Sequence, residues 1–409
     1  MAVPTDALAL RIAAHVSALC KAGVDRFLGT DANALAVAHV ADSMRQHGLA
    51  VESLPFETVG WRRGSARIEF DGQEPKLHVG PFSPPMPRTT LPLTAVSTPA
   101  ALAELDARGA ALLLYGQIAA EQLTPRGYPF YDNPEHTAIL DAIERAAPVA
   151  IIAATGKNPA STAALSPFPL VEDGTFPLPS TYLAEADIAP LLDIATRGGD
   201  VTVSIDSGRC VSRGEQLVGR LGDPGAGRRI IVCAHIDTKP DTPGALDNAT
   251  GVATLLAAAE LLAEDPPPGL ALEFVPFNGE DHFAAPGEMA FLAAHPPGDD
   301  IALVINIDGA GLVGGPSAVS TYALAPGMET IVANLVETHS HVTSGEPWFA
   351  SDRAIFAMRG IPAAAITSAE FGRIMEHIAH TPADTPDLAD ATVLADTARF
   401  IAELVRLVT

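Results

Sequence analysis

The sequence predicts an α/β fold with a doubly wound, mainly parallel sheet. After Gly214, short apolar segments rich in β-branched residues alternate with segments of helical spacing. Strands that alternate with helices of this length are typical of a parallel sheet with helices on both faces. The predicted strands are 229–234, 270–277, 302–307 and 363–367, and the predicted helices are 249–263, 287–294, 327–339 and 388–408.

The first 200 residues divide into two parts of different texture. Helical spacing predicts helices over 5–23 and 31–47, the second capped by Asp31 and followed by Gly48, and a strand over 49–55. From about Gly60, short alternating runs are separated by proline-rich turns such as FSPPMPRTTLP. In this part we expect strands at 110–115, 149–153 and 200–205, with helices at 99–107 and 135–146.

This change of texture indicates two domains. We expect residues 60–206 to form a smaller, β-rich α/β domain inserted into a discontinuous domain of residues 1–59 and 207–409. A chain of 409 residues has room for two such cores. The inserted part holds no cluster of metal-type ligands in its sequence, so we expect it to shape the substrate pocket or to support a homo-oligomer.

The composition excludes several kinds of partner. With 25 basic and 49 acidic residues the formal charge is −24, which argues against nucleic acids and anionic membranes. Cys20, Cys210 and Cys233 form no CxxC pair, so a disulfide framework is not expected. The N-terminus lacks the pattern of a signal peptide, and no run of about 18 uncharged apolar residues is present. We therefore expect a soluble, cytoplasmic protein.

Residues of metal-ligand type follow several of the predicted strands. His235 and Asp237 come where the strand 229–234 ends, and Asp247 stands at the start of the next helix. In open α/β sheets, ligands bind outside the carboxyl ends of the strands. Each residue alone could be a helix cap, a turn residue or a surface histidine. Their recurrence at one kind of position instead favours a metal site, with the candidate ligands His235, Asp247, Asp281, Asp308 and His380.

These residue types suit zinc. Imidazole and carboxylate are good zinc ligands, and one carboxylate can bridge two ions. Two ions about 3.5–4 Å apart can activate water and stabilise a developing oxyanion. Asp237 is placed to accept the second imidazole N–H of His235, although it could also be an acidic turn residue. Because Glu280 and Asp281 are adjacent, one carboxylate can bind metal while the other transfers protons.

Six segments in order resemble a known family. AHID, LDNATG, FNGED, NID, SDRAIF and HTPADT are similar to motifs of the zinc exopeptidases, which include bacterial leucyl aminopeptidases, glutamate carboxypeptidase II and glutaminyl cyclases. The transferrin receptor is a non-catalytic relative. The resemblance covers about 214–409 and 1–58, and residues 60–206 resemble the protease-associated domain found inside many members. It implies a zinc exopeptidase-like fold.

The resemblance also implies a role for each candidate residue. His235 and Asp308 would bind one zinc ion, Asp281 and His380 a second, and Asp247 would bridge them. Glu280 would be the general base. His380 is preferred over His377 because it begins HTPADT. The chain departs from the family pattern in three places: Asp281 replaces the second residue of the usual Glu-Glu pair, Arg353 replaces a common His, and Glu288 replaces a common small residue.

The implied function is metal-dependent hydrolysis of an amide bond in a small peptide or amino-acid conjugate, as an aminopeptidase. The alternative is a carboxypeptidase or N-acyl-amino-acid hydrolase. An aminopeptidase needs an acidic anchor, for which Asp352 and Glu370 are candidates, and the alternative needs a cationic one, Arg353 or Arg373. Glutaminyl cyclisation is less expected because those relatives generally lack the insert. A non-catalytic binding protein would have lost ligands that this chain retains.

Overall fold

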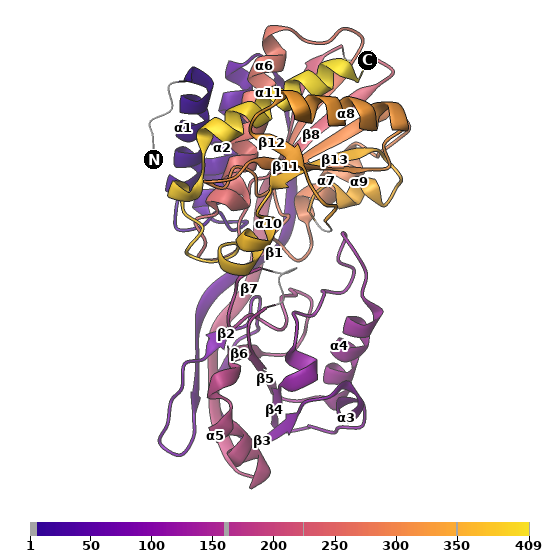
Figure 1. The fold of residues 1–409 in the computed structure, drawn as a ribbon. Helices are drawn as coiled ribbons and strands as arrows, with labels where there is room; N and C mark the ends of the chain where they lie inside the picture. The colour runs from indigo at the N-terminus through magenta and orange to yellow at the C-terminus, as the bar shows by residue number, and fades with distance from the viewer. Residues whose placement is uncertain (1–5, 159–162, 224, 349–350, 409) are drawn as a thin grey trace. The chain divides into compact units, whose positions relative to one another are not determined.

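The computed structural model describes residues 6–158, 163–223, 225–348 and 351–408. The chain forms two compact units, drawn in Figure 1. One consists of Met1–Glu57 and Arg213–Thr409, and the other of Thr58–Ser212. The first boundary lies two residues before the predicted 59/60, and the second lies six residues after the predicted 206/207. We describe each unit by itself.

The discontinuous unit is built on a mainly parallel sheet, which confirms the predicted fold class. Its strand order is β12-β11-β13-β10-β8-β9-β7. The parallel core consists of β8 (Arg229–His235), β9 (Ala271–Phe277), β10 (Ile301–Ile307) and β13 (Ala363–Ser368). The flanking strands are β11 (Ser317–Tyr322), antiparallel to β13, β12 (Val342–Ser344), parallel to β11, and the end of β7 (Asp200–Gly222), antiparallel to β9.

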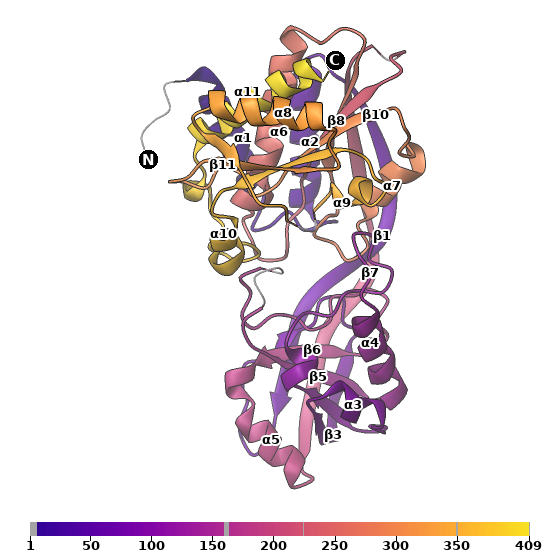
Figure 2. The same cartoon turned by 45° about the vertical axis from the view of Figure 1, so that its right-hand side comes forward.

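Helices cover both faces of this sheet (Figures 1 and 2). Phe274 of β9 points into the larger core, which it shares with five helices. These are α1 (Ala7–Lys21), α2 (Asp31–Gln46), α6 (Thr250–Glu264), α8 (Pro326–Thr338) and α11 (Ala391–Leu407). Phe277 lies three residues further along and faces the other side. There it packs against Phe291 of α7 (Pro286–Ala294) and Phe356 of α9 (Ala354–Ala357).

Local sequence explains where these helices begin and end. The Thr30 side chain accepts the N–H of Asn33 and caps α2, so the predicted cap Asp31 is instead its first residue. Gly48 follows α2 with φ +80°, a conformation that suits glycine. The segment Ala245–Glu264 is apolar enough by composition to cross a membrane, but 83% of its window is buried within the unit. A largely buried core helix passes the same test.

The inserted unit has its own small sheet and two apolar cores. Its central strands β3 (Met86–Val96), β4 (Ala111–Leu114), β5 (Ala150–Thr155) and β6 (Ser180–Ala184) are parallel neighbours. β2 (His78–Val79) pairs with β6, and the long strands β1 (Ala50–Glu69) and β7 pair with each other and continue across both unit boundaries. The helices are α3 (Pro99–Ala103), α4 (Pro134–Ala146) and α5 (Ala189–Thr196).

Candidate metal centre

The carboxyl ends of three parallel strands carry most of the candidate site. His235 is the last residue of β8, Asp308 directly follows β10, and Asp281 lies four residues beyond the end of β9. Asp247 lies in the short π-helical turn Ala245–Ala249 that leads into α6. His380 follows α10 (Phe371–His377). The fold thus brings all five predicted ligands to one edge of the sheet.

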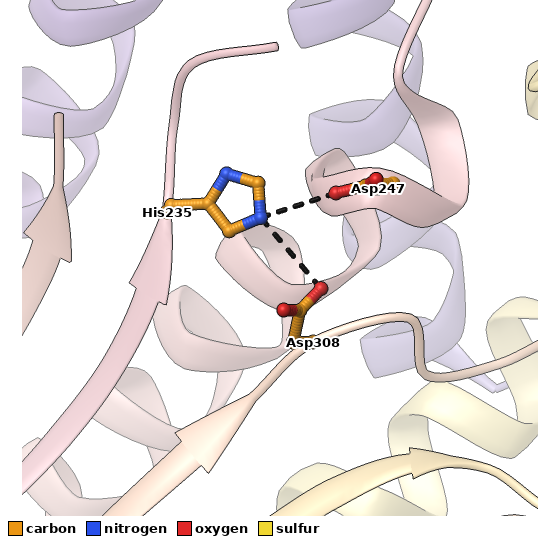
Figure 3. Close-up of side chains that lie close together, drawn as sticks. All are labelled: His235, Asp247 and Asp308. Atoms are coloured by element: carbon orange, nitrogen blue, oxygen red, sulfur yellow. Dashed lines mark ion pairs between the residues drawn. The ribbon is translucent and has the colours of Figure 1, made fainter. Parts of the chain in front are cut away.

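The ligand atoms form two groups that share Asp247. In the first, Nε2 of His235 lies 3.1 Å from Oδ1 of Asp247 and 3.6 Å from Oδ1 of Asp308, as Figure 3 shows. In the second, Nε2 of His380 lies 3.2 Å from Oδ2 of Asp247 and 3.3 Å from Oδ1 of Asp281. Within each group the ligand atoms lie within 4.8 Å of one another. Each oxygen of Asp247 therefore faces a different group.

The electrostatics of the site reflect this crowding of acids around two imidazoles. Burial opposes the change, but hydrogen bonds with His235 and His380 lower the pKa of Asp247 below its usual value. Burial likewise disfavours a charged His380, yet Asp281 and Asp247 raise the pKa of His380 to about 10. The buried carboxylates favour a positive charge beside them, and the protonated imidazoles supply it here. A divalent cation would satisfy the same carboxylates.

The residues present fit zinc. Three carboxylates and two imidazoles are the ligand types that zinc prefers. Oδ2 of Asp281 is buried and has no hydrogen-bond partner in the described part of the chain, so it retains a lone pair for a cation. The shorter side chain of Asp281, compared with Glu, still reaches to within 3.3 Å of His380.

Glu280 lies beside the ligands. It forms a third group with His235 and Asp281, whose potential ligand atoms also lie within 4.8 Å of one another. Burial raises the pKa of Glu280 well above its usual range; the charge of His235 opposes the rise, and that of Asp281 adds to it. A carboxyl group of raised pKa can accept and hold a proton near neutral pH.

The Asp237 carboxylate lies beside Nδ1 of His235, where the sequence predicts it, and it also binds a backbone turn. Its oxygens accept the backbone N–H groups of Gly279, Glu280 and Asp281 at 2.9, 3.1 and 3.1 Å. The nearest carboxylate oxygen lies 3.7 Å from Nδ1 of His235, whereas the backbone carbonyl oxygen of Asp237 lies 3.2 Å away. Both the carbonyl and the carboxylate of Asp237 therefore face Nδ1 of His235, and the carboxylate also holds the turn that carries the two acidic residues.

Sequence reasoning missed two residues that support the ligands. Both oxygens of Asp384 accept backbone N–H groups at the ligand turn, from Leu246 at 2.7 Å and Asp247 at 3.0 Å. Burial, with repulsion from Asp247, raises the pKa of Asp384 to about 7. Asp384 is part of HTPADT, so that motif was the available signal. Lys239 donates to the backbone carbonyl of Asp281 at 2.7 Å, and nothing in the local pattern indicates this contact.

Two of the predicted substrate anchors, and the alternative histidine, lie on the surface. Glu370 and Arg373 pair with each other at 3.0 Å, and their side chains are 49% and 51% exposed. They satisfy each other one turn apart on the helix surface. His377 is 62% exposed and lies beside Glu376, so the structure brings His380 and not His377 to the metal-ligand groups.

The other two anchors are buried. Asp352 lies beside Glu288, both are fully buried, and none of their carboxyl oxygens accepts a hydrogen bond from another group in the described chain. Burial, followed by repulsion from Asp237, raises the pKa of Glu288 to about 7. Arg353 is 3% exposed; its guanidinium lies 4.3 Å from the ring centre of Tyr322 and 4.4 Å from that of Trp348, and it donates to the Tyr322 hydroxyl.

An α/β unit that gathers two imidazoles and several carboxylates at its strand ends has the architecture of a metal-dependent hydrolase. Residues 216–405 match Peptidase family M28, so the larger unit carries an M28 domain. This match confirms the resemblance to the di-metal exopeptidases.

Solved structures with the same fold cover almost the whole chain. An aminopeptidase from Aneurinibacillus sp. strain AM-1 has a TM-score of 0.74 at 19% identity, covering 97% of this chain and 93% of its own. BSAP, a zinc aminopeptidase from Bacillus subtilis, has a TM-score of 0.71 at 19% identity, covering 97% and 94%. At this identity the likeness concerns the fold.

A curated relative shares only a segment. The "Putative endoplasmic reticulum metallopeptidase 1-A" of Caenorhabditis elegans is 28% identical over 134 residues, which are 32% of this chain. The match spans 15% of that relative's length.

Proposed function

We propose that this chain is a zinc-dependent aminopeptidase that hydrolyses the amide bond after the free amino end of a small peptide or amino-acid conjugate. The observation that carries the proposal is the pair of ligand groups that share Asp247, with Glu280 beside them. The M28 domain and the aminopeptidase fold of its structural neighbours support the same activity.

We infer that the site holds two ions. His235 and Asp308 would hold one, Asp281 and His380 the other, and Asp247 would contact both through its two oxygens. Bound zinc would supply Lewis acidity, which polarises the scissile carbonyl and makes water more acidic.

Glu280 is the residue that moves the proton. In the proposed reaction its carboxylate accepts a proton from the attacking water and gives it to the nitrogen of the departing amine. The water oxygen forms a C–O bond with the scissile carbonyl carbon, and the amide C–N bond then breaks. The products are a carboxylate and an amine. Asp237 fixes the backbone N–H of Glu280 and so holds the base in place.

The cationic groups that the alternative needs already bind other side chains. Arg373 pairs with Glu370 at 3.0 Å on the surface. Arg353, the buried cation that would serve the alternative, stacks between two rings and bonds to Tyr322. The carboxypeptidase or N-acyl-amino-acid hydrolase activity therefore ranks second.

We also propose that Thr58–Ser212 is a protease-associated domain and that the protein acts in the cytoplasm. The separate cores of the inserted unit, around Leu112 and Val201, support its status as a domain. The cysteines support the location, because Cys20, Cys210 and Cys233 form no CxxC pair and no disulfide framework is expected.

The test is hydrolysis of three matched dipeptides by the zinc-loaded chain: one with both ends free, one with an acetylated amino end and one with an amidated carboxyl end. An aminopeptidase cleaves the first and third and not the second. Cleavage of the acetylated peptide, with or without the free peptide but not the amidated one, would support the alternative. Glu280→Gln, purified in the same way, controls for contaminating peptidases. Absence of cleavage by the zinc-loaded chain of any amide substrate would overturn the enzyme proposal.

A further inference from the structure

Arg26 is a buried arginine that contacts the loop between two metal-ligand candidates. It lies between α1 and α2, outside the segment matched by the M28 family, and is 1% exposed. Its guanidinium donates to three backbone carbonyls: Nε to Ile236, Nη1 to Pro243 and Nη2 to Gly244, each at 2.8 Å. These carbonyls lie near the two ends of the loop that joins His235 to Asp247.

The backbone of Arg26 extends this contact. Its N–H donates to Oγ1 of Thr238 at 2.8 Å. Arg26 therefore binds the residue before Asp237 and the residue after it. Asp237 is the residue whose carbonyl faces Nδ1 of His235 and whose carboxylate holds the turn with Glu280. Loss of the Arg26 contacts would therefore allow Asp237, and with it His235 and Glu280, to shift.

A neighbouring side chain strengthens the attachment. Oδ2 of Asp25 accepts the N–H of Asp241 at 2.9 Å, in the middle of the same loop. The backbone carbonyl of Arg26 accepts from Nδ2 of Asn33 at 3.1 Å, and Asn33 also donates to Asn278 near the end of β9. The segment 25–33 is thus bonded both to the His235–Asp247 loop and to the strand end that leads to Glu280.

The choice of arginine follows from its geometry. A guanidinium has five N–H donors in a planar fork, and here three of its nitrogens bind three carbonyls at once. A lysine ammonium is a compact point donor that cannot span both ends of the loop. The carbonyls partly compensate the buried positive charge, and the Asp384 carboxylate attracts it.

We propose that Arg26 is a positioning residue of the metal centre, which fixes the loop between His235 and Asp247 and so sets the zinc affinity of the site. The inference rests on the proposed zinc site. It extends the functional site to a segment outside the matched family region. Residues that bond directly to metal ligands commonly change metal affinity by about 10–100-fold when they are removed, and Arg26 holds the residues that flank such ligands.

The experiment measures zinc affinity by competition with a chromogenic chelator, beside the melting temperature of the metal-free chain. Arg26→Ala should lose at least about tenfold in affinity. Guanidinium ion at millimolar concentration should restore part of that loss, and methylammonium should not. Arg26→Lys should resemble Arg26→Ala, because the charge without the fork does not hold three carbonyls. If Arg26→Ala does not fold, Arg26→Lys carries the test alone.

The matched control is Arg220→Ala. Arg220 lies in the same unit and pairs with Glu52 and Glu273 at the amino end of β9, away from the ligands. It should lose stability and keep its zinc affinity. If the Arg26 variants melt lower but bind zinc like the wild type, Arg26 is structural only and the inference fails. If the wild type itself binds no zinc, the proposed function fails first and the inference with it.

Discussion

Both units of this molecule contain parallel strands, but among the described residues only the larger unit brings metal-ligand side chains together at the strand ends. In the larger unit, His235 ends β8, Asp281 lies beyond β9 and Asp308 follows β10, and each belongs to a group able to hold a metal. In the inserted unit, β4, β5 and β6 are also parallel. Yet residues 58–158 and 163–212 contribute no side chain to a group able to hold a metal.

The polar residues of the inserted unit bind its own chain instead. Thr155, the last residue of β5, donates to the carbonyl of Phe168 at 2.7 Å. His136 accepts the N–H of Thr124 at 3.0 Å, which ties α4 to a loop. A parallel sheet thus provides positions at which ligands can converge, and the side chains at those positions decide whether a site exists. The following predictions test or sharpen this difference.

The largest effect should come from Glu280→Gln. The amide keeps the size and hydrogen-bonding reach of Glu280 but cannot accept a proton, so turnover should fall by about 10²–10⁴-fold. Zinc content, measured by atomic absorption, should stay at the wild-type level. Asp281→Asn is the matched control: it should lose zinc from one group and regain part of its activity in excess zinc. If the two variants exchange these outcomes, the roles of the two residues are reversed.

A large effect on metal content is expected from Asp247→Ala. Each oxygen of Asp247 faces a different ligand group, so its loss removes one ligand from both and leaves two cations to repel each other. Zinc content should fall to one ion or none. Asp390→Ala, which removes the cap of α11, is the control and should cost about 1 kcal/mol with zinc retained. Two zinc ions in Asp247→Ala would contradict the shared-ligand assignment.

Replacement of residues 58–212 by a short linker tests the comparison directly. Glu57 and Arg213 flank the insert and form an ion pair at 2.8 Å, so a few residues suffice to join them. Because every candidate ligand lies in the larger unit, zinc content should be unchanged. We expect a change in relative kcat/KM among peptides of different length, or in mass by light scattering. Identical values for both would show that the insert has neither predicted role.

The two units also differ in how far the sequence could predict them. In the larger unit, alternation of apolar strands and helices identified β8, β9, β10 and β13, and the strand ends indicated the candidate ligands that the structure brings together. It missed β11, SAVSTY, because small polar residues at the flank of a sheet lack the continuous apolar run of a buried strand. The strands predicted at 49–55 and 200–205 are much shorter than β1 and β7, which have 20 and 23 residues. Neither strand keeps a regular apolar alternation along its length.

The sequence predicted the candidate ligands of the site better than the residues that hold those ligands in place. Ligand types at strand ends are visible in a sequence, since the fold class places them together. The contacts of Arg26 with residues more than 200 positions away are not visible, because tertiary packing alone creates them. The same holds for the second contact of the Asp237 carboxylate: its position indicated a role beside His235, but its bonds to the 279–281 turn depend on tertiary packing.

The smallest effect concerns a part of the larger unit remote in sequence from the ligands. Nδ1 of His15 in α1 and Nε2 of His39 in α2 lie 3.0 Å apart. Burial, followed by the charges of His39, His47 and Arg11, lowers the pKa of His15 to about 4 from 6.5. Glu260 pairs with Arg11 at 2.6 Å and approaches His47 at 3.9 Å.

The folded state therefore binds fewer protons here than the unfolded state between pH 6.5 and about 4, and its stability must fall as the pH is lowered through this window. The full shift corresponds to about 3 kcal/mol, which solvent screening of the partly exposed pair reduces to roughly 2 kcal/mol.

His15→Asn removes this titration. Urea unfolding of the zinc-free chain at pH 4.5 and 7.5 should show a smaller loss of stability at low pH in His15→Asn than in the wild type. The exposed His377→Asn should behave like the wild type. An equal loss in all three chains would mean that the histidine pair does not contribute, and that carboxyl groups alone set the acid stability of this unit.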